Sequence, residues 1–201
     1  MIYKRFLVII MAFTIIAGLN LGTCQAAVGT PLEIAEVGTL MLPAGLDITD
    51  ANDTETKPGL SSQYDLVCLS NDTWHYGRLV VFKDKRDMGL AAEMFNQGIQ
   101  NRQVLKVLSD AAKDMIEKNL TNNGSKLLQW YSPKTALIGK HKGLSLAARF
   151  TATDKLPMPL YASMYFYMPS RQLVGLAIIC PDSDRQYWDP LFRDSVANLE
   201  Y

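Results

Sequence analysis

The strongest hydrophobic pattern in the chain is a pair of apolar segments joined by the short polar stretch Pro169–Gln172. The first segment, Tyr161–Met168, alternates: alanine, methionine and phenylalanine fall on one face of an extended chain, and tyrosine and serine fall on the other. The second segment, Leu173–Cys180, is apolar on both faces, which is typical of a strand covered on both sides. Together they predict a β-hairpin at the centre of a sheet.

Shorter extended patterns predict the rest of this sheet. The predicted strands are Leu32–Ile34 with Gly38–Pro43 as a short opening strand or strand pair, Tyr64–Ser70 paired with Gly77–Lys83, and then Lys126–Tyr131, Thr135–Gly139 and Leu144–Thr151. Between the first two groups, Asp47–Gly59 is rich in carboxylates, proline and glycine, and is predicted to be a surface loop.

Two segments have the period of a helix. In Gln103–Leu120 the apolar residues recur at steps of three and four, so that one face is apolar and the other charged. Near the C-terminus, Asp189 suits an N-cap and Pro190 the first helical position of a closing helix. A short helix is also predicted at Gly89–Phe95, and the fold class is therefore α+β.

The first 26 residues have the layout of a secretory signal peptide. Lys4 and Arg5 precede an uncharged apolar stretch, and the small residues Cys24 and Ala26 predict cleavage after Ala26. Residues 27–201 then form a single domain, which is exported to the periplasm, the cell envelope or the medium. Two membrane-bound alternatives stay open, an uncleaved N-terminal anchor and a lipoprotein acylated at Cys24.

The composition argues against several classes of partner and site. Removal of Lys4 and Arg5 leaves 18 basic residues against 20 acidic ones, a net charge of −2, which does not recruit nucleic acid or an anionic membrane. The sequence contains no glycine-rich phosphate loop and no nucleophile elbow. Its histidines and cysteines lack the spacing of metal ligands, so we expect no cofactor, no metal and no catalytic residue.

Two cysteines, Cys68 and Cys180, remain after cleavage, and each ends an apolar strand. An exported protein can keep a disulfide, so the two either form one or are buried free thiols. A second hypothesis makes the protein a thiol-dependent enzyme or redox protein using Cys68, with His75 as the base. The apolar surroundings of Cys68 disfavour this, because they raise the pKa of a thiol.

An aromatic face is the candidate partner surface. It consists of Tyr161, Tyr165 and Tyr167 of the hairpin, joined by Trp130 and Tyr131. Tyrosine and tryptophan are enriched in protein interfaces. The alternative is that a helix covers the three hairpin tyrosines and makes them core, and the two-sided apolar character of the hairpin favours this alternative.

The order of elements resembles the Mog1/PsbP-like family of α/β/α sandwiches. The matching features are the strand Gly38–Pro43, the helix Gln103–Leu120, the strand through Leu137–Gly139, the hairpin Tyr161–Cys180 and the closing helix at Asp194–Val196. The resemblance implies an antiparallel sheet flanked by helices and a non-enzymatic binding or accessory role with a protein partner. It carries over no site residue.

Overall fold

The computed structural model describes residues 31–34, 37–43, 45–49, 63–70, 75–84, 87–153 and 158–200. The predicted signal peptide, its cleavage after Ala26 and the acylation of Cys24 lie outside the described residues and stay predictions. Among the helices that are described, none is long and apolar enough to cross a membrane.

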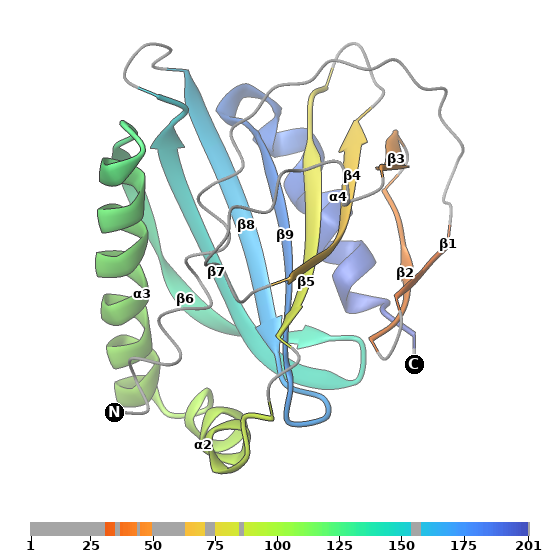
Figure 1. Cartoon of the computed structure of the whole chain (residues 1–201), viewed down its shortest axis with the longest axis vertical. Helices are drawn as coiled ribbons and strands as arrows, with labels where there is room; N and C mark the ends of the chain where they lie inside the picture. The colour runs from red at the N-terminus through yellow and green to blue at the C-terminus, as the bar shows by residue number, and fades with distance from the viewer. Residues whose placement is uncertain are drawn as a thin grey trace.

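Seven strands form one sheet in the order β3-β4-β5-β9-β8-β7-β6, and every neighbouring pair is antiparallel (Figure 1). The strands are β3 (Leu46–Thr49), β4 (Gln63–Ser70), β5 (Arg78–Asp84), β6 (Leu127–Ile138), β7 (His141–Thr151), β8 (Pro159–Tyr167) and β9 (Leu173–Pro181). Since the order ends with β6, this strand is an edge of the sheet.

The predicted central hairpin is confirmed. Strands β8 and β9 pair along their length, with Tyr167 opposite Val174 and Leu160 opposite Pro181. β9 is the fourth of the seven strands, and every residue of Leu173–Ile178 is buried. Its apolar side chains on both faces therefore need a covering layer on each side.

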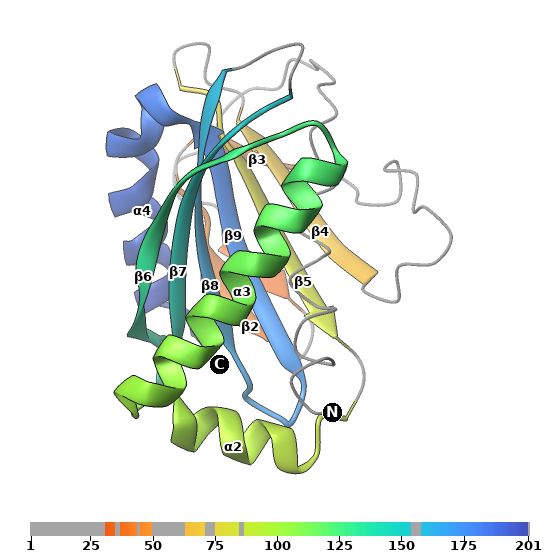
Figure 2. The same ribbon diagram turned by 90° about the vertical axis from the view of Figure 1, so that its left-hand side faces the viewer.

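Two layers provide this cover (Figure 2). One face packs against α2 (Leu90–Gly98) and α3 (Arg102–Asn122). The other packs against α4 (Arg185–Ala197) and a two-stranded sheet of β1 (Pro31–Ile34) and β2 (Gly38–Met41). The fold is an α/β/α sandwich with an antiparallel sheet, as the family resemblance implies.

Local sequence explains the long helix α3. At its start, the side chain of Asn101 accepts hydrogen bonds from the backbone N–H groups of Gln103, at 2.8 Å, and Val104, at 3.4 Å. Its buried positions Ala112, Ile116 and Leu120 recur every four residues and pack on the sheet. The predicted helix is confirmed, with one residue more at the start and two more at the end.

The start of the closing helix was predicted wrongly. α4 begins at Arg185, directly after the 3-10 turn η3 (Asp182–Asp184), so Asp189 is not its N-cap and Pro190 lies inside it. The reason is tertiary: Trp188 is fully buried and donates a hydrogen bond of 3.0 Å to the carbonyl of Tyr76. Docking of this indole extends the helix by more than a turn toward its N-terminus.

Two further expectations need correction. The predicted loop Asp47–Gly59 begins inside strand β3, while its residues from 50 onward lie outside the described part of the chain. The two strands predicted on either side of Pro133 form the single strand β6. The register shifts between Tyr131 and Lys134, so the break expected at the proline is a bulge in an edge strand, where proline is tolerated.

Candidate functional site

Edge strand β6 has a groove along each of its sides. Trp130 faces the α3 layer and Tyr131 faces the α4 layer, because successive side chains of a strand point to opposite faces. A groove of about 770 Å³ lies between α3 and β6, and one of about 950 Å³ lies between β6, β7 and the start of α4. Gln129 lines both. We name them the α3 groove and the Arg–Tyr groove.

The sheet register builds the Arg–Tyr groove. Gln129 lies opposite Arg149, Arg149 opposite Tyr161, and Tyr161 opposite Cys180. These residues therefore form one row across four strands on the α4 face, with Tyr131 two positions along β6 from Gln129. The turn η3 and the first turns of α4 supply the facing wall, with Asp182, Ser183, Arg185, Gln186 and Asp189.

One guanidinium in this groove is neutralised within the chain. Arg149 donates through Nε to Oδ1 of Asp182 at 2.9 Å and through Nη2 to Oδ2 at 2.6 Å. Its Nη1 donates to Oε1 of Gln129 at 3.3 Å. Such a bidentate pair fixes the orientation of both side chains. Because the side chains of Arg149 and Asp182 are 32% and 24% exposed, the pair is only partly screened by solvent.

The second guanidinium is held by aromatic rings. Cζ of Arg185 lies 4.8 Å from the ring centroid of Tyr131 and 4.6 Å from that of Tyr161. Its Nη1 donates to the hydroxyl of Tyr131 at 2.6 Å. Each cation–π contact contributes about 0.5–2 kcal/mol, depending on how far it is desolvated. Within the described ranges, no carboxylate lies within 4.0 Å of this guanidinium, so its positive charge has no salt-bridge partner there.

The acidic residue Asp189 of α4 is hydrogen-bonded to a tyrosine. Asp189 follows Arg185 by one helical turn, but its Oδ1 accepts a hydrogen bond of 2.9 Å from the hydroxyl of Tyr161. Burial raises the pKa of Tyr161 above its ordinary value, and the charge of Asp189 and this hydrogen bond raise it further. Tyr161 therefore stays protonated and donates, and the groove holds a fixed cation and a fixed anion side by side.

These groups are suited to binding. Guanidinium, amide, hydroxyl and carboxylate groups can recognise charge and hydrogen-bonding groups on a partner. The nearby thiol of Cys180 is no nucleophile, because burial, followed by the charges of Asp184, Asp189 and Asp182, raises its pKa to about 12. Nor can Tyr161 act as a base near neutral pH, because its hydroxyl remains protonated.

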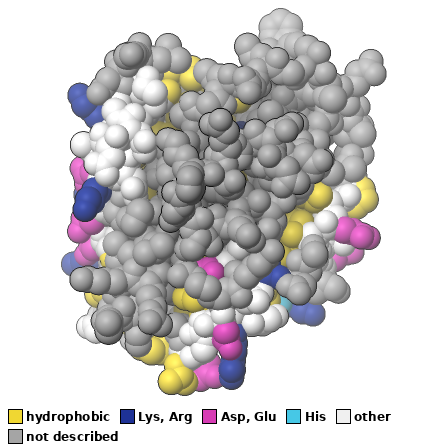
Figure 3. Space-filling view, viewed as in Figure 1, with side chains coloured by type: hydrophobic (Ala, Val, Ile, Leu, Met, Phe, Trp, Pro, Cys, Tyr) yellow, Lys and Arg dark blue, Asp and Glu magenta, His cyan; other side chains and the backbone are white. Residues whose placement is uncertain are grey.

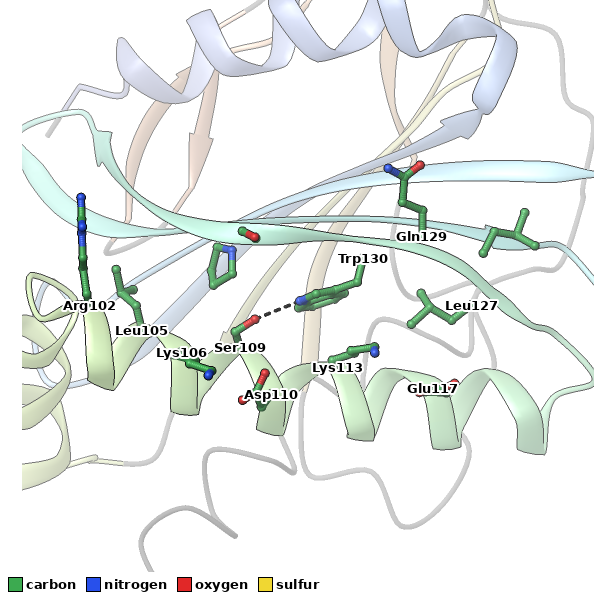
Figure 4. A pocket seen from close by; sticks show the side chains of 13 residues that line it. Arg102, Leu105, Lys106, Ser109, Asp110, Lys113, Glu117, Leu127, Gln129 and Trp130 are labelled. Atoms are coloured by element: carbon green, nitrogen blue, oxygen red, sulfur yellow. Dashed lines mark hydrogen bonds between the residues drawn. The ribbon is translucent and has the colours of Figure 1, made fainter.

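The α3 groove is built differently (Figure 4). Its floor is apolar, with Leu105, Leu127 and the ring of Trp130 half-buried between helix and strand. Trp130 reaches from β6 to α3, where its Nε1 donates to Oγ of Ser109 at 2.9 Å. Charged residues of α3 form its wall: Arg102, Lys106, Asp110, Lys113 and Glu117.

The structure separates the five aromatic residues of the predicted partner surface. Tyr161, Tyr165 and Tyr167 are 3%, 6% and 0% exposed, because α4 covers them. An exposed surface made of these three is therefore wrong, and the alternative that they are core holds. Trp130 and Tyr131 are half-buried on opposite faces of β6, one in each groove.

The disulfide between Cys68 and Cys180 is also contradicted. Cys68 lies in β4 and Cys180 in β9, and β5 runs between these strands. Two interstrand spacings separate them by about 10 Å, whereas a disulfide needs Cα atoms within about 7 Å. Cys180 is a buried free thiol. The side chain of Cys68 lies outside the described part of the chain, so its role in a thiol enzyme stays a prediction.

The other half of that hypothesis, His75, lies outside both grooves. Its ring stacks on Tyr187 with centroids 3.9 Å apart and an interplanar angle of 9°. No group of three or more acidic, histidine or cysteine residues in the described segments could hold a metal ion.

Sequence reasoning missed the charged residues of the Arg–Tyr groove. Arg149 carried a usable signal, since it is a lone charge in the otherwise uncharged strand predicted at Leu144–Thr151. Asp182 and Arg185 carried no such signal, because the sequence predicts that the closing helix starts after them. Their position depends on the docking of Trp188, which no local pattern reveals.

Solved structures with a similar arrangement are known. PsbP from the cyanobacterium Synechocystis sp. PCC 6803 is 16% identical, with 89% of this chain and 96% of PsbP aligned and a TM-score of 0.47. LpqN, involved in cell envelope biogenesis of Mycobacterium tuberculosis, is 10% identical over 84% of this chain and 86% of LpqN, with a TM-score of 0.46. The Ran-binding protein Mog1p of Saccharomyces cerevisiae is 12% identical over 87% of this chain and 90% of Mog1p, with a TM-score of 0.41.

The α/β/α arrangement that the Mog1/PsbP-like resemblance implies is present in the structure itself, and the similarity to these solved structures concerns the arrangement of elements alone. No family model matches the chain, and no curated protein matches it closely enough to count as a relative.

We expect Cys180 to be chemically inert in the folded protein. In a chain with Cys24→Ser and Cys68→Ser, iodoacetamide at pH 8 should alkylate Cys180 at least about 100-fold more slowly than a free cysteine, because the thiolate is scarce and buried. In denaturant the rate should return to the ordinary one. Equal rates in the native and denatured protein, measured by intact mass, would contradict the buried, protonated thiol.

Proposed function

We propose that this chain is an exported, non-enzymatic binding or accessory protein that holds a protein partner in the Arg–Tyr groove. One observation carries the proposal: Arg185 is fixed between the rings of Tyr131 and Tyr161 without a carboxylate partner among the described residues. A fixed guanidinium whose N–H groups are not engaged by any carboxylate of the described chain is suited to an incoming anionic group.

The composition and rigidity of the groove support a protein partner. Arginine and tyrosine are among the residues that dominate binding energy at protein interfaces. The pair Arg149–Asp182 and the cradle of Arg185 already restrict these side chains, so a partner does not have to order them. Ordering costs about 0.5–1.5 kcal/mol for each flexible side chain, and pre-organisation avoids that cost.

The partner is expected to present a carboxylate to Arg185. Arg149 is already paired with Asp182, so Arg185 is the groove's cation that remains available. An acidic side chain or a C-terminal carboxylate can accept two N–H groups of a guanidinium at once. The apolar floor under such a contact is the ring of Tyr161.

We expect Arg185→Gln to weaken partner binding by at least about tenfold, the effect of losing one charge-assisted contact of 1.5–3 kcal/mol. Arg193→Gln is the matched control, since Arg193 is on the same helix, its side chain is 61% exposed, and its Nε lies 3.8 Å from Oδ1 of Asp194. A photo-crosslinking residue placed at Gln186, on the rim of the groove, identifies the partner in the native envelope and gives the readout.

The proposal requires one and the same crosslinked partner to appear with the unmodified protein and with Arg193→Gln, and to be lost with Arg185→Gln. Circular dichroism and thermal unfolding show whether Arg185→Gln remains folded, and Arg185→Lys is the milder variant if it does not. A crosslink that persists at full strength in a folded Arg185→Gln protein would refute the groove as the contact surface.

The export component has its own test. The intact mass of the natively expressed protein should correspond to a chain starting at Ala27, because Cys24 and Ala26 have the spacing of a cleavage site. A mass that includes acyl chains on Cys24 would instead indicate a lipid-anchored envelope protein. A mass that starts at Met1, with the protein in the cytoplasmic fraction, would contradict export.

A further inference from the structure

The outer face of α3 carries four charged side chains of alternating sign. Lys106, Asp110, Lys113 and Glu117 are all exposed, and their spacing of three and four residues places them in one row along the helix. In Figure 3 acidic and basic side chains alternate down the side of the molecule where α3 lies in Figure 1. We call these four residues the charged row.

The four charges form no ion pair with one another or with the rest of the described chain. A spacing of three or four residues would allow neighbours in the row to pair along the helix. Yet within the part of the chain that the structure describes, none of the four forms an ion pair of 4.0 Å or shorter. Their charges are therefore available to a group from outside.

The order of the signs makes the charged row complementary to a second copy of itself that runs in the opposite direction. If a second α3 lies antiparallel to the first, with the twofold axis passing between Asp110 and Lys113, Lys106 faces Glu117 of the other copy. Asp110 then faces the other copy's Lys113, and all four charges of each helix meet an opposite charge. A parallel arrangement in register would bring like charges together, so only the antiparallel one is complementary. This is the self-complementary pattern that a twofold interface requires.

We propose that a second copy of this chain docks on the α3 face through the charged row, related to the first by a twofold axis. The α3 groove beside the row supplies apolar area, with a half-buried floor of Leu105, Leu127 and Trp130. Leu128 on β6, which also lines this groove, adds an exposed apolar side chain, 49% exposed. The apolar area provides attraction, and the charges fix the orientation.

The α3 face lies on the other side of β6 from the Arg–Tyr groove, so this inference is independent of the proposed partner. The edge strand itself is poorly suited to sheet-to-sheet pairing, because Pro133 lacks an N–H and the register shifts beside it. Contacts through the helix and its groove, and not a continued sheet, are therefore the expected mode of association.

Charge reversal gives a sharp test by sedimentation velocity on the mature chain. The wild-type protein should dimerise. Asp110→Lys makes both members of a facing pair positive, and Lys113→Asp makes both negative, so each variant alone should dimerise at least about tenfold more weakly. An equimolar mixture should regain dimers, because each positive site of one variant then faces a negative site of the other.

The mixture distinguishes the interface from an effect within one helix. Pairing inside α3 cannot be restored by adding another chain, and recovery also proves that both variants are folded. Lys118→Asp is the control, since it changes charge by the same amount but points about 100° away from Glu117 around the helix, and it should leave dimerisation unchanged. A wild-type protein that stays monomeric at 100 µM, or a mixture that stays as dissociated as its components, would overturn the proposal.

Discussion

The structure depends on the burial of one face of strand β8 that is rich in tyrosine. The opposite face is aliphatic apart from one phenylalanine, so it packs against α3 without polar atoms to satisfy. On the tyrosine face, which lies under α4, each tyrosine side chain buries an apolar ring together with a hydroxyl that needs a hydrogen-bond partner. Tyr165 packs edge-to-face on Phe192, and Tyr161 donates to Asp189. The second helical layer is thus fixed by apolar area and by the hydrogen bond of the Tyr161 hydroxyl to Asp189.

The Arg–Tyr groove follows from this constraint. Because Tyr161 donates a hydrogen bond to Asp189, Arg185, one turn earlier, packs against the faces of two tyrosine rings instead. Asp182, in the turn η3 before the helix, pairs with Arg149. The polar groups that anchor α4 to the sheet therefore form an ordered, partly exposed cluster at the rim of the Arg–Tyr groove. On the other side of β6, aliphatic packing leaves α3 with an outer face whose charges have no partner in the described chain.

Much of the fold could be predicted because its strongest signals are local. The period of two in Tyr161–Met168 and the period of three to four in Gln103–Leu120 each describe one element and the face that it buries. The site could not be predicted in the same way, since Arg149, Asp182 and Arg185 come together through sheet register and through the docking of Trp188. The choice between a disulfide and free thiols could not be made from sequence for a related reason: each cysteine ends a strand, but strand order places β5 between them.

The most direct test of this account is the mobility of the Arg185 guanidinium in solution. Relaxation of its side-chain Nε–H group, measured by nitrogen-15 NMR, should give an order parameter near about 0.85, the value of rigid backbone, because two rings and a hydroxyl hold it. The exposed Arg193 on the same helix provides the internal reference and should fall below about 0.6. Equal, low order parameters for the two arginines would contradict a pre-organised binding groove.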